Sequence, residues 1–397
     1  MFPSRTLHHL SFSLYHLPSG MEYLDARIKN AKSFKDDWTQ IRDLYSRKLW
    51  HQLTLQVLES LNKPGFTASI DLNEFDQQLL NSIKAKINPL SLAEILVPMS
   101  NEMVTKDPQS TIKFLEENRD KYMGMNDEAL ILAQSTIGMI RLLILQDLPG
   151  ARDIIEATGD ILSKIDGVTP VHSRYYRMSS QYFKLMGQHA EYYQEALRFL
   201  GCTDLSELSE TEKQDWAFSV GLAALLGRNV YNFGELISHE ILETLRLKPD
   251  VAWLVDLLHA FNKGDLDTIL QLRPQWSAVK DLSDACELLQ EKALLLALME
   301  MFFRRPPNQR TVSFTDIAMA TKSPLDKVEG IVMRALSLNL MKGRIDEVNQ
   351  KVTLTWLQPR VLDLDQITSM ANRLAEWQRS VTMVRDLVSV DAKKLLV

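Results

Sequence analysis

The chain has 397 residues, a formal net charge of −6 at neutral pH and a sequence pI of about 5.8. This length requires either two or three packed units or one elongated helical array. The 45% hydrophobic and 24% charged residues are typical of folded chains, so disorder over most of the length is excluded. The acidic balance provides no overall positive field for phosphate backbones or acidic lipids, which disfavours nucleic-acid binding.

Residues 1–35 are predicted to form an N-terminal extension that is disordered. The first twenty residues contain no acid, and His8, His9 and His16 interrupt their apolar residues, so a secretory signal is poorly formed. A transit peptide, a disordered tail and an upstream reading with Met21 as the usual start all remain open.

Residues 36–305 read as one helix after another, with apolar side chains at three- and four-residue spacing. Asp107 before Pro108 is typical of an N-cap and first helical position, and Ser209 followed by Glu212 is typical of a capping box. Helix starts near Pro89, Asn126, Pro170 and Ser209 are spaced by roughly 35–45 residues, the length of a helix-turn-helix repeat. We therefore expect a mostly α fold with a TPR-like solenoid, divided into a repeat array over 36–170 and the helical part of a second domain over 171–305.

A winged-helix module is predicted over residues 310–358, which completes the second domain, 171–358. Pro306 and Pro307 end the helical region. A short strand, a helix capped by Thr315, and a helix from Pro324 to about Leu340 precede strands near 345–348 and 352–356. In the last strand alternate apolar residues predict one buried face that holds the hairpin on the module, namely Val352, Leu354 and Trp356.

The final segment, residues 359–397, is predicted to be a long helix with a heptad seam. Burying seven apolar side chains gains at most ~10–20 kcal/mol, whereas ordering about 25 residues costs ~1–2 kcal/mol of backbone entropy each. Such a helix is marginal alone, so we expect an apolar groove from its own domain or from helices of other subunits. The partner-binding seam consists of Ile367, Met370, Leu374, Trp377, Val381, Val384 and Val388.

No catalytic, cofactor-binding or metal-binding residue is predicted, so we do not expect an enzyme. Lys never follows Gly directly, and no Gly-rich dinucleotide fingerprint or Gly-x-Ser-x-Gly elbow is present. The histidines lack a partner at metal-ligand spacing. Cys202 and Cys286 lie far apart, which favours a reducing compartment over a disulfide framework. No apolar run approaches the ~20 residues of a membrane-spanning helix.

A winged helix can bind DNA, and its charge tests that alternative. Residues 311–357 contain six basic and five acidic residues. The helix that would read a DNA groove has Asp326 and Glu329 where a base-reading helix would place Arg, Lys, Asn or Gln. Contact with proteins is therefore the better explanation, and a nucleic-acid-binding winged-helix protein remains the alternative.

Long strings in the chain resemble the PCI-domain subunits of the proteasome regulatory-particle lid, from about Trp38 to the C-terminus. They are "LYSRKLWHQLTLQVL" (44–58), "HAEYYQEALRFLGC" (189–202), "YNFGEL" (231–236), "LMEMFFRRP" (298–306) and "KGRIDEVNQKVTLTWLQPRVLDL" (342–364). Residues 1–35 do not match the family start. A PCI scaffold of the signalosome or of the translation initiation factor is a second possibility.

The resemblance implies a non-catalytic scaffold subunit, cytoplasmic and nuclear, that supports lid assembly and ubiquitin-dependent protein degradation. In such assemblies the winged helices of PCI subunits join into a horseshoe and their C-terminal helices gather into one bundle. The implied partners are other PCI-type and lid subunits, with no small-molecule substrate, nucleic acid or membrane. The deubiquitinating metal site of the lid belongs to a different type of subunit.

Overall fold

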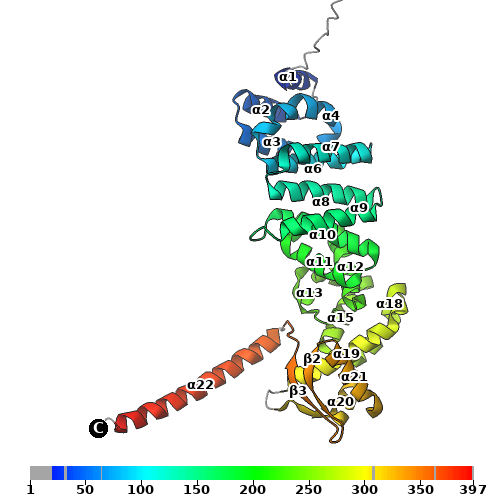
Figure 1. Ribbon diagram of the computed structural model, residues 1–397, viewed down its shortest axis with the longest axis vertical. Helices are drawn as coiled ribbons and strands as arrows, with labels where there is room; N and C mark the ends of the chain where they lie inside the picture. The colour runs from blue at the N-terminus through cyan, green and yellow to red at the C-terminus, as the bar shows by residue number, and fades with distance from the viewer. Residues whose placement is uncertain (1–19, 31–33, 64, 306–308, 362–363, 396–397) are drawn as a thin grey trace, which may run out of the picture. The chain divides into compact units, whose positions relative to one another are not determined.

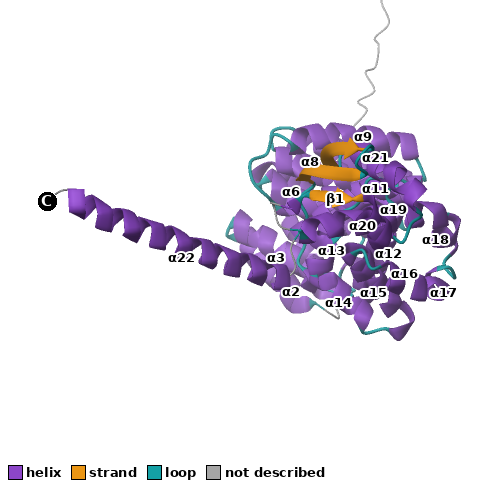
Figure 2. Cartoon of the chain, turned by 90° about the horizontal axis from the view of Figure 1, so that it is seen from below, coloured by secondary structure: helices purple, strands orange, loops and turns teal. Residues whose placement is uncertain are grey.

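A computed structural model describes residues 20–30, 34–63, 65–305, 309–361 and 364–395 of the chain. The chain divides into two compact units, Met1–Leu185 and Met186–Val397. Figure 1 shows that both consist mainly of helices, and Figure 2 shows the strands of the second unit.

Unit 1 is built from helices, three of which start at or next to positions expected from the sequence. Asn88, Asp107 and Asn126 accept hydrogen bonds from backbone N–H groups at the starts of α6 (Pro89–Val104), α7 (Pro108–Asn118) and α8 (Asp127–Leu143). Two π-helical turns are η2 (Asp76–Leu80) and η4 (Arg119–Met123), and two 3-10 turns are η1 (Thr67–Ser69) and η3 (Lys84–Lys86). The α-helices are α1 (Gly20–Asn30), α2 (Lys35–Ser46), α3 (Trp50–Asn62), α4 (Leu72–Phe75), α5 (Asn81–Ile83), α6 (Pro89–Val104), α7 (Pro108–Asn118), α8 (Asp127–Leu143), α9 (Leu148–Leu162) and α10 (Pro170–Met186).

Helix α1 corrects the expectation that residues 1–35 form a disordered extension. Tyr23 and Leu24 are buried, and the Tyr23 ring packs edge-on against Trp38 of α2 with centroids 6.4 Å apart. An ion pair joins Asp25 to Arg42 at 2.7 Å. These contacts give α1 the tertiary partner that a short helix needs for stability. The expectation for residues 1–19 lies outside the described residues.

Helix α10 packs with unit 1, so the observed division falls at its end and not at residue 170. The Tyr175 hydroxyl donates to the Ile155 carbonyl of α9 at 3.3 Å. Met178 packs closely on Gly138 of α8, where an added Cβ would lie 2.1 Å from the Met178 sulfur. A larger residue at position 138 would require the Met178 side chain to move.

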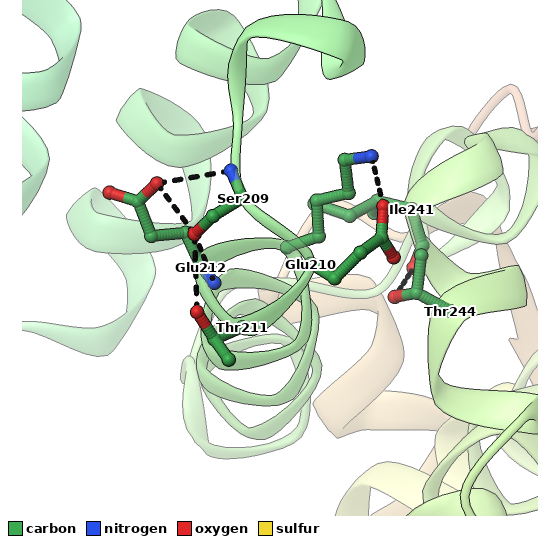
Figure 3. A network of polar contacts seen from close by, with 7 residues as sticks. Ser209, Glu210, Thr211, Glu212, Ile241 and Thr244 are labelled. Carbon is green, nitrogen blue, oxygen red and sulfur yellow. Dashed lines mark hydrogen bonds and ion pairs between the residues drawn. The ribbon is translucent and has the colours of Figure 1, made fainter. Parts of the chain in front are cut away.

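In unit 2, the predicted capping box is present at the start of α12 (Glu210–Leu226). The Glu212 N–H donates to the Ser209 hydroxyl at 3.3 Å, and the Ser209 N–H donates to the Glu212 carboxylate at 3.2 Å (Figure 3). Two 3-10 turns are η5 (Leu205–Glu207) and η6 (Glu240–Leu242). The helices up to the winged helix are α11 (His189–Cys202), α12 (Glu210–Leu226), α13 (Gly234–Ser238), α14 (Glu243–Arg246), α15 (Pro249–Lys263), α16 (Leu266–Gln271), α17 (Arg273–Trp276), α18 (Lys280–Asp284) and α19 (Cys286–Arg304).

The winged helix has the predicted order of elements with shifted bounds. Its elements are β1 (Thr311–Ser313), α20 (Phe314–Thr321), α21 (Leu325–Ser337), β2 (Met341–Asp346) and β3 (Lys351–Leu357). The three strands form an antiparallel sheet in the order β1-β3-β2. The cap of α20 is Ser313 and not Thr315, because the Ser313 hydroxyl accepts the Asp316 N–H at 3.2 Å.

Ion pairs fasten the winged helix to the helices of unit 2. Arg305 lies 3.1 Å from Asp316 of α20, and Arg334 of α21 lies 2.6 Å from Glu291 of α19. Lys322, at the end of α20, pairs with Asp267 of α16. The final helix of the unit is α22 (Leu364–Leu395).

Candidate partner-binding surface

Helix α22 has 32 residues and carries the predicted seam. Its rise of ~1.5 Å per residue gives a length of about 48 Å. Six seam side chains are 48–68% exposed, and Trp377 is the most exposed of them. Val388 lies in α22, but its side chain is outside the described residues. The described seam side chains are Ile367, Met370, Leu374, Trp377, Val381 and Val384.

Two further apolar side chains of α22 widen the seam near its C-terminal half. Met383 and Leu387 are 62% and 67% exposed. In the heptad of the seam they occupy the c and g positions, on the same side of the stripe. The sequence prediction missed them because it counted only the a and d positions. A search for apolar residues beside the seam would have found them.

The segment that leads into α22 is fixed to the helices of unit 2. The Arg360 guanidinium lies 2.9 Å from the Glu300 carboxylate of α19, and it also donates to Asn262 of α15 at 3.1 Å. Burial lowers the pKa of Arg360, while the Glu300 charge opposes this change. Val361 sits against Gly234, where an added Cβ would lie 2.4 Å from the Val361 Cβ.

Sequence reasoning did not identify Arg360. Its only signal is a single arginine after Pro359, at the end of the predicted wing. Nothing in that local pattern indicates Glu300 or Asn262, because both partners lie far away along the chain.

The hairpin places two of its three predicted structural residues in the core. Val352 and Leu354 are buried, whereas Trp356 is 39% exposed. Lys342 pairs with Trp356 and Gly343 pairs with Leu354, so Thr355 is an extra residue on β3. This β-bulge shifts the alternation of faces. The expectation that Trp356 shares the buried face is therefore wrong.

The exposed Trp356 ring has a cationic neighbour. The Lys342 ammonium lies 5.2 Å from the ring centroid, a separation typical of a cation–π contact. The Thr355 hydroxyl donates to the Lys342 carbonyl at 2.9 Å. The outer face of the hairpin thus presents an aromatic ring and a positive charge together.

Two surface hollows of unit 2 provide other places for contact. One, of about 460 Å³, lies between α19 and α21 and is lined by Leu294, Leu295 and Ile331 with charged residues around them. The other, of about 590 Å³, is lined by polar residues that include Asp204, His239 and Glu240. In the described part of the chain, no group of three or more His, Cys, Asp or Glu side chains could hold a metal ion. Over the same residues, no helix is both long and apolar enough to span a bilayer.

Comparison with known proteins finds two family matches along the chain. A family described as PSD13 N-terminal repeats matches residues 37–258, and the PCI domain matches residues 269–356. The first match covers more than half of the chain and ends within α15. The second covers the winged helix up to residue 356, one residue before β3 ends.

Full-length relatives extend these matches to nearly the entire chain. The 26S proteasome non-ATPase regulatory subunit 13 of Dictyostelium discoideum is 34% identical over 95% of this chain and 98% of its own length. The probable 26S proteasome regulatory subunit rpn9 of Schizosaccharomyces pombe is 35% identical over 94% and 96%. The 26S proteasome regulatory subunit RPN9 of Saccharomyces cerevisiae is 34% identical over 89% and 92%. With its helical repeats, its winged helix and these relatives, the chain belongs to the family of 26S proteasome non-ATPase regulatory subunit 13.

Proposed function

We propose that the chain is a non-catalytic structural subunit of the proteasome regulatory particle, which joins neighbouring lid subunits and so supports ubiquitin-dependent protein degradation. The exposed seam of α22 carries this proposal. A soluble chain rarely leaves a regular apolar stripe in water unless a partner covers it. Each seam side chain that becomes fully buried gains at most about 1.5–3 kcal/mol, so several together can hold a helix in a bundle.

The winged helix supplies a second contact surface in this proposal. Val352 and Leu354 keep the hairpin on the module, while Trp356 and Lys342 face outward, where an adjacent PCI subunit can contact them. In this proposal the repeat array ends with α10, the PCI domain follows from Met186 to residue 358, and residues 359–397 carry the bundle helix. The proposed location is the cytoplasm and the nucleus, as the resemblance to subunits of the regulatory-particle lid implies.

Scaffolding in the lid is better supported than the two rival assignments. The relatives that match nearly the whole chain are named as proteasome subunits, which favours the proteasome over the signalosome or the initiation factor. For DNA binding, six basic and five acidic residues in the winged helix leave little positive field.

The test is the substitution Trp377→Glu in the full-length, affinity-tagged chain. A charge in the middle of a buried seam loses apolar contact and is costly to desolvate. Co-purification of other regulatory-particle subunits, quantified by mass spectrometry, should fall at least about tenfold, which corresponds to ~1.4 kcal/mol of lost binding.

Asn372→Glu is the matched control for this experiment. It adds one negative charge to an exposed residue of the same helix, at the f position opposite the seam, and should leave co-purification unchanged. If Trp377→Glu chains still bring down the particle as well as the unmodified chain, the bundle role is refuted. Recovery of signalosome or initiation-factor subunits instead would support the rival scaffolds.

A further inference from the structure

The residues that flank the seam of α22 carry positive charge and no negative charge. In the heptad that places Ile367, Leu374 and Val381 at a, the e and g positions between 366 and 387 are occupied by seven residues. Arg373 and Arg385 are the charged residues among them, and both are exposed. The full set is Gln366, Ala371, Arg373, Gln378, Ser380, Arg385 and Leu387.

The two acidic residues of the same stretch occupy neither e nor g positions. Glu376 occupies a c position and Asp386 an f position. Asp386 forms an ion pair with Arg385 at 3.1 Å, with both side chains more than 60% exposed. Such an exposed pair between adjacent residues contributes little, so Arg385 remains able to pair with a carboxylate on another helix.

A second copy of this chain is a poor occupant of the seam. In a parallel pair of two copies, Arg373 at g would face Gln378 at e, and Arg385 at e would face Ser380 at g. No antiparallel register supplies a carboxylate from the flanks either, because these positions contain none.

We propose that the occupant of the seam is an amphipathic helix of a different chain, whose own apolar stripe is flanked by Glu or Asp. This inference rests on the proposed function, because it names the chemistry of the partner at the same surface. Carboxylates at the partner's flanking positions meet Arg373 and Arg385 in either helix orientation. The apolar seam supplies affinity, and the two arginines select the partner.

The experiment measures binding of designed peptides to the full-length chain. Two helical peptides, each about four heptads long, have the same Ile and Leu seam; one has Glu at every e and g position and the other has Lys. Binding of each labelled peptide is followed by fluorescence anisotropy at low and at high salt. The Glu-flanked peptide should bind at least about threefold more tightly, because two exposed ion pairs replace two repulsions, and added salt should narrow this difference.

Two charge reversals on the same helix locate the effect. Arg373→Glu at the g position should lower the preference for the Glu-flanked peptide at least about threefold. Arg379→Glu makes the same charge change at the outer f position and should leave the preference unaltered. Equal effects of the two variants would mean a general charge effect and would overturn the proposal.

Equal binding of the two peptides, or binding of neither, would also overturn the proposal. So would sedimentation experiments in which the unmodified chain forms a dimer and the Trp377→Glu chain does not. The proposed function fails separately, since it depends on co-purification of the Trp377→Glu chain with the regulatory particle. If that variant loses the particle while the peptides bind equally, the seam role stands and only the partner's chemistry is wrong.

Discussion

Lys292 is a charged residue in the interior of unit 2, on α19. Its ammonium donates to the carbonyl oxygens of Ala224, Leu225 and Gly227 at 2.7, 3.0 and 2.8 Å, where α12 ends. The last carbonyls of a helix lack partners within it and carry partial negative charge. Lys292 satisfies them and joins α19 to α12.

Replacing Lys292 with Met should destabilise unit 2. The methionine keeps much of the apolar stem, but it leaves buried carbonyls without a donor, which costs about 1–3 kcal/mol. Thermal unfolding of the full-length chain at pH 7, followed by circular dichroism, measures the loss. Lys327→Met at an exposed position is the control and should melt as the unmodified chain does; an equal midpoint for both variants would show that the carbonyl contacts contribute nothing.

The stability contributed by this site should also depend on pH. Burial lowers the pKa of Lys292 from 10.5 to about 7. Between these values the unfolded chain holds a proton that the folded chain has lost, so the free energy of unfolding rises with pH by up to about 1.4 kcal/mol per pH unit. Below about pH 7 both states are protonated and this contribution stays constant. The gap between the unmodified chain and Lys292→Met should therefore widen from pH 7 to pH 10, and a constant gap in urea titrations would contradict the shift.

At the residue scale, polar contacts between residues far apart along the chain could not be predicted from the sequence. Lys292 directly precedes the apolar run "ALLLALM" (293–299), and nothing local indicates carbonyls more than sixty residues away. Trp356 shows a limit of the two-residue strand pattern. Strict alternation predicts that its side chain is buried, but one extra residue in β3 moves the side chain to the exposed face. Val352 and Leu354 lie before the bulge, and there the two-residue period correctly gives the buried face.

At the element scale, helix starts were the most predictable features. Pro108 after Asp107 and the Ser209 box are confirmed because each cap is a local interaction between residues two or three apart. Helix α1 was missed, although Met21, Leu24 and Ile28 have helical spacing. Because residues 1–35 match the family start poorly, they were expected to be disordered in spite of this helical spacing.

Helix α1 contributes to the core of unit 1, which Leu24→Ala tests. Leu24 is fully buried, and truncating a buried leucine to alanine costs about 2–5 kcal/mol. Hydrogen exchange followed by mass spectrometry should show faster exchange in α1 and in α2, against which it packs. Lys29→Ala changes an exposed residue of the same helix and should leave exchange in α2 unaltered; protection of α2 that persists in Leu24→Ala would mean that α1 only lies on the surface.

At the scale of the whole molecule, stability and assembly use different parts of the chain. Among the described residues, the buried apolar side chains of each unit all precede residue 361, whereas the seam side chains of α22 are about half exposed or more. The sequence predicted the seam because a heptad is a local period. It left open whether the chain's own domain or other subunits cover that seam, since periodicity does not identify the covering surface.

A chain that ends at Val361 separates these two possibilities. If other subunits cover the seam, removing α22 deletes no core contact, and the thermal midpoint of the shortened chain should stay within about 2 °C of the full-length value, equivalent to less than ~1 kcal/mol. The contacts of Arg360 with Glu300 and Asn262 remain in this chain, so the end of the winged helix keeps its anchor. Co-purification of regulatory-particle subunits should nevertheless fall as far as it does for Trp377→Glu. A midpoint lowered by much more would mean that the chain's own units bury the seam, because the loss of buried apolar surface lowers the stability of the shortened chain. Helix α22 would then be part of the fold and not a contact with neighbouring subunits.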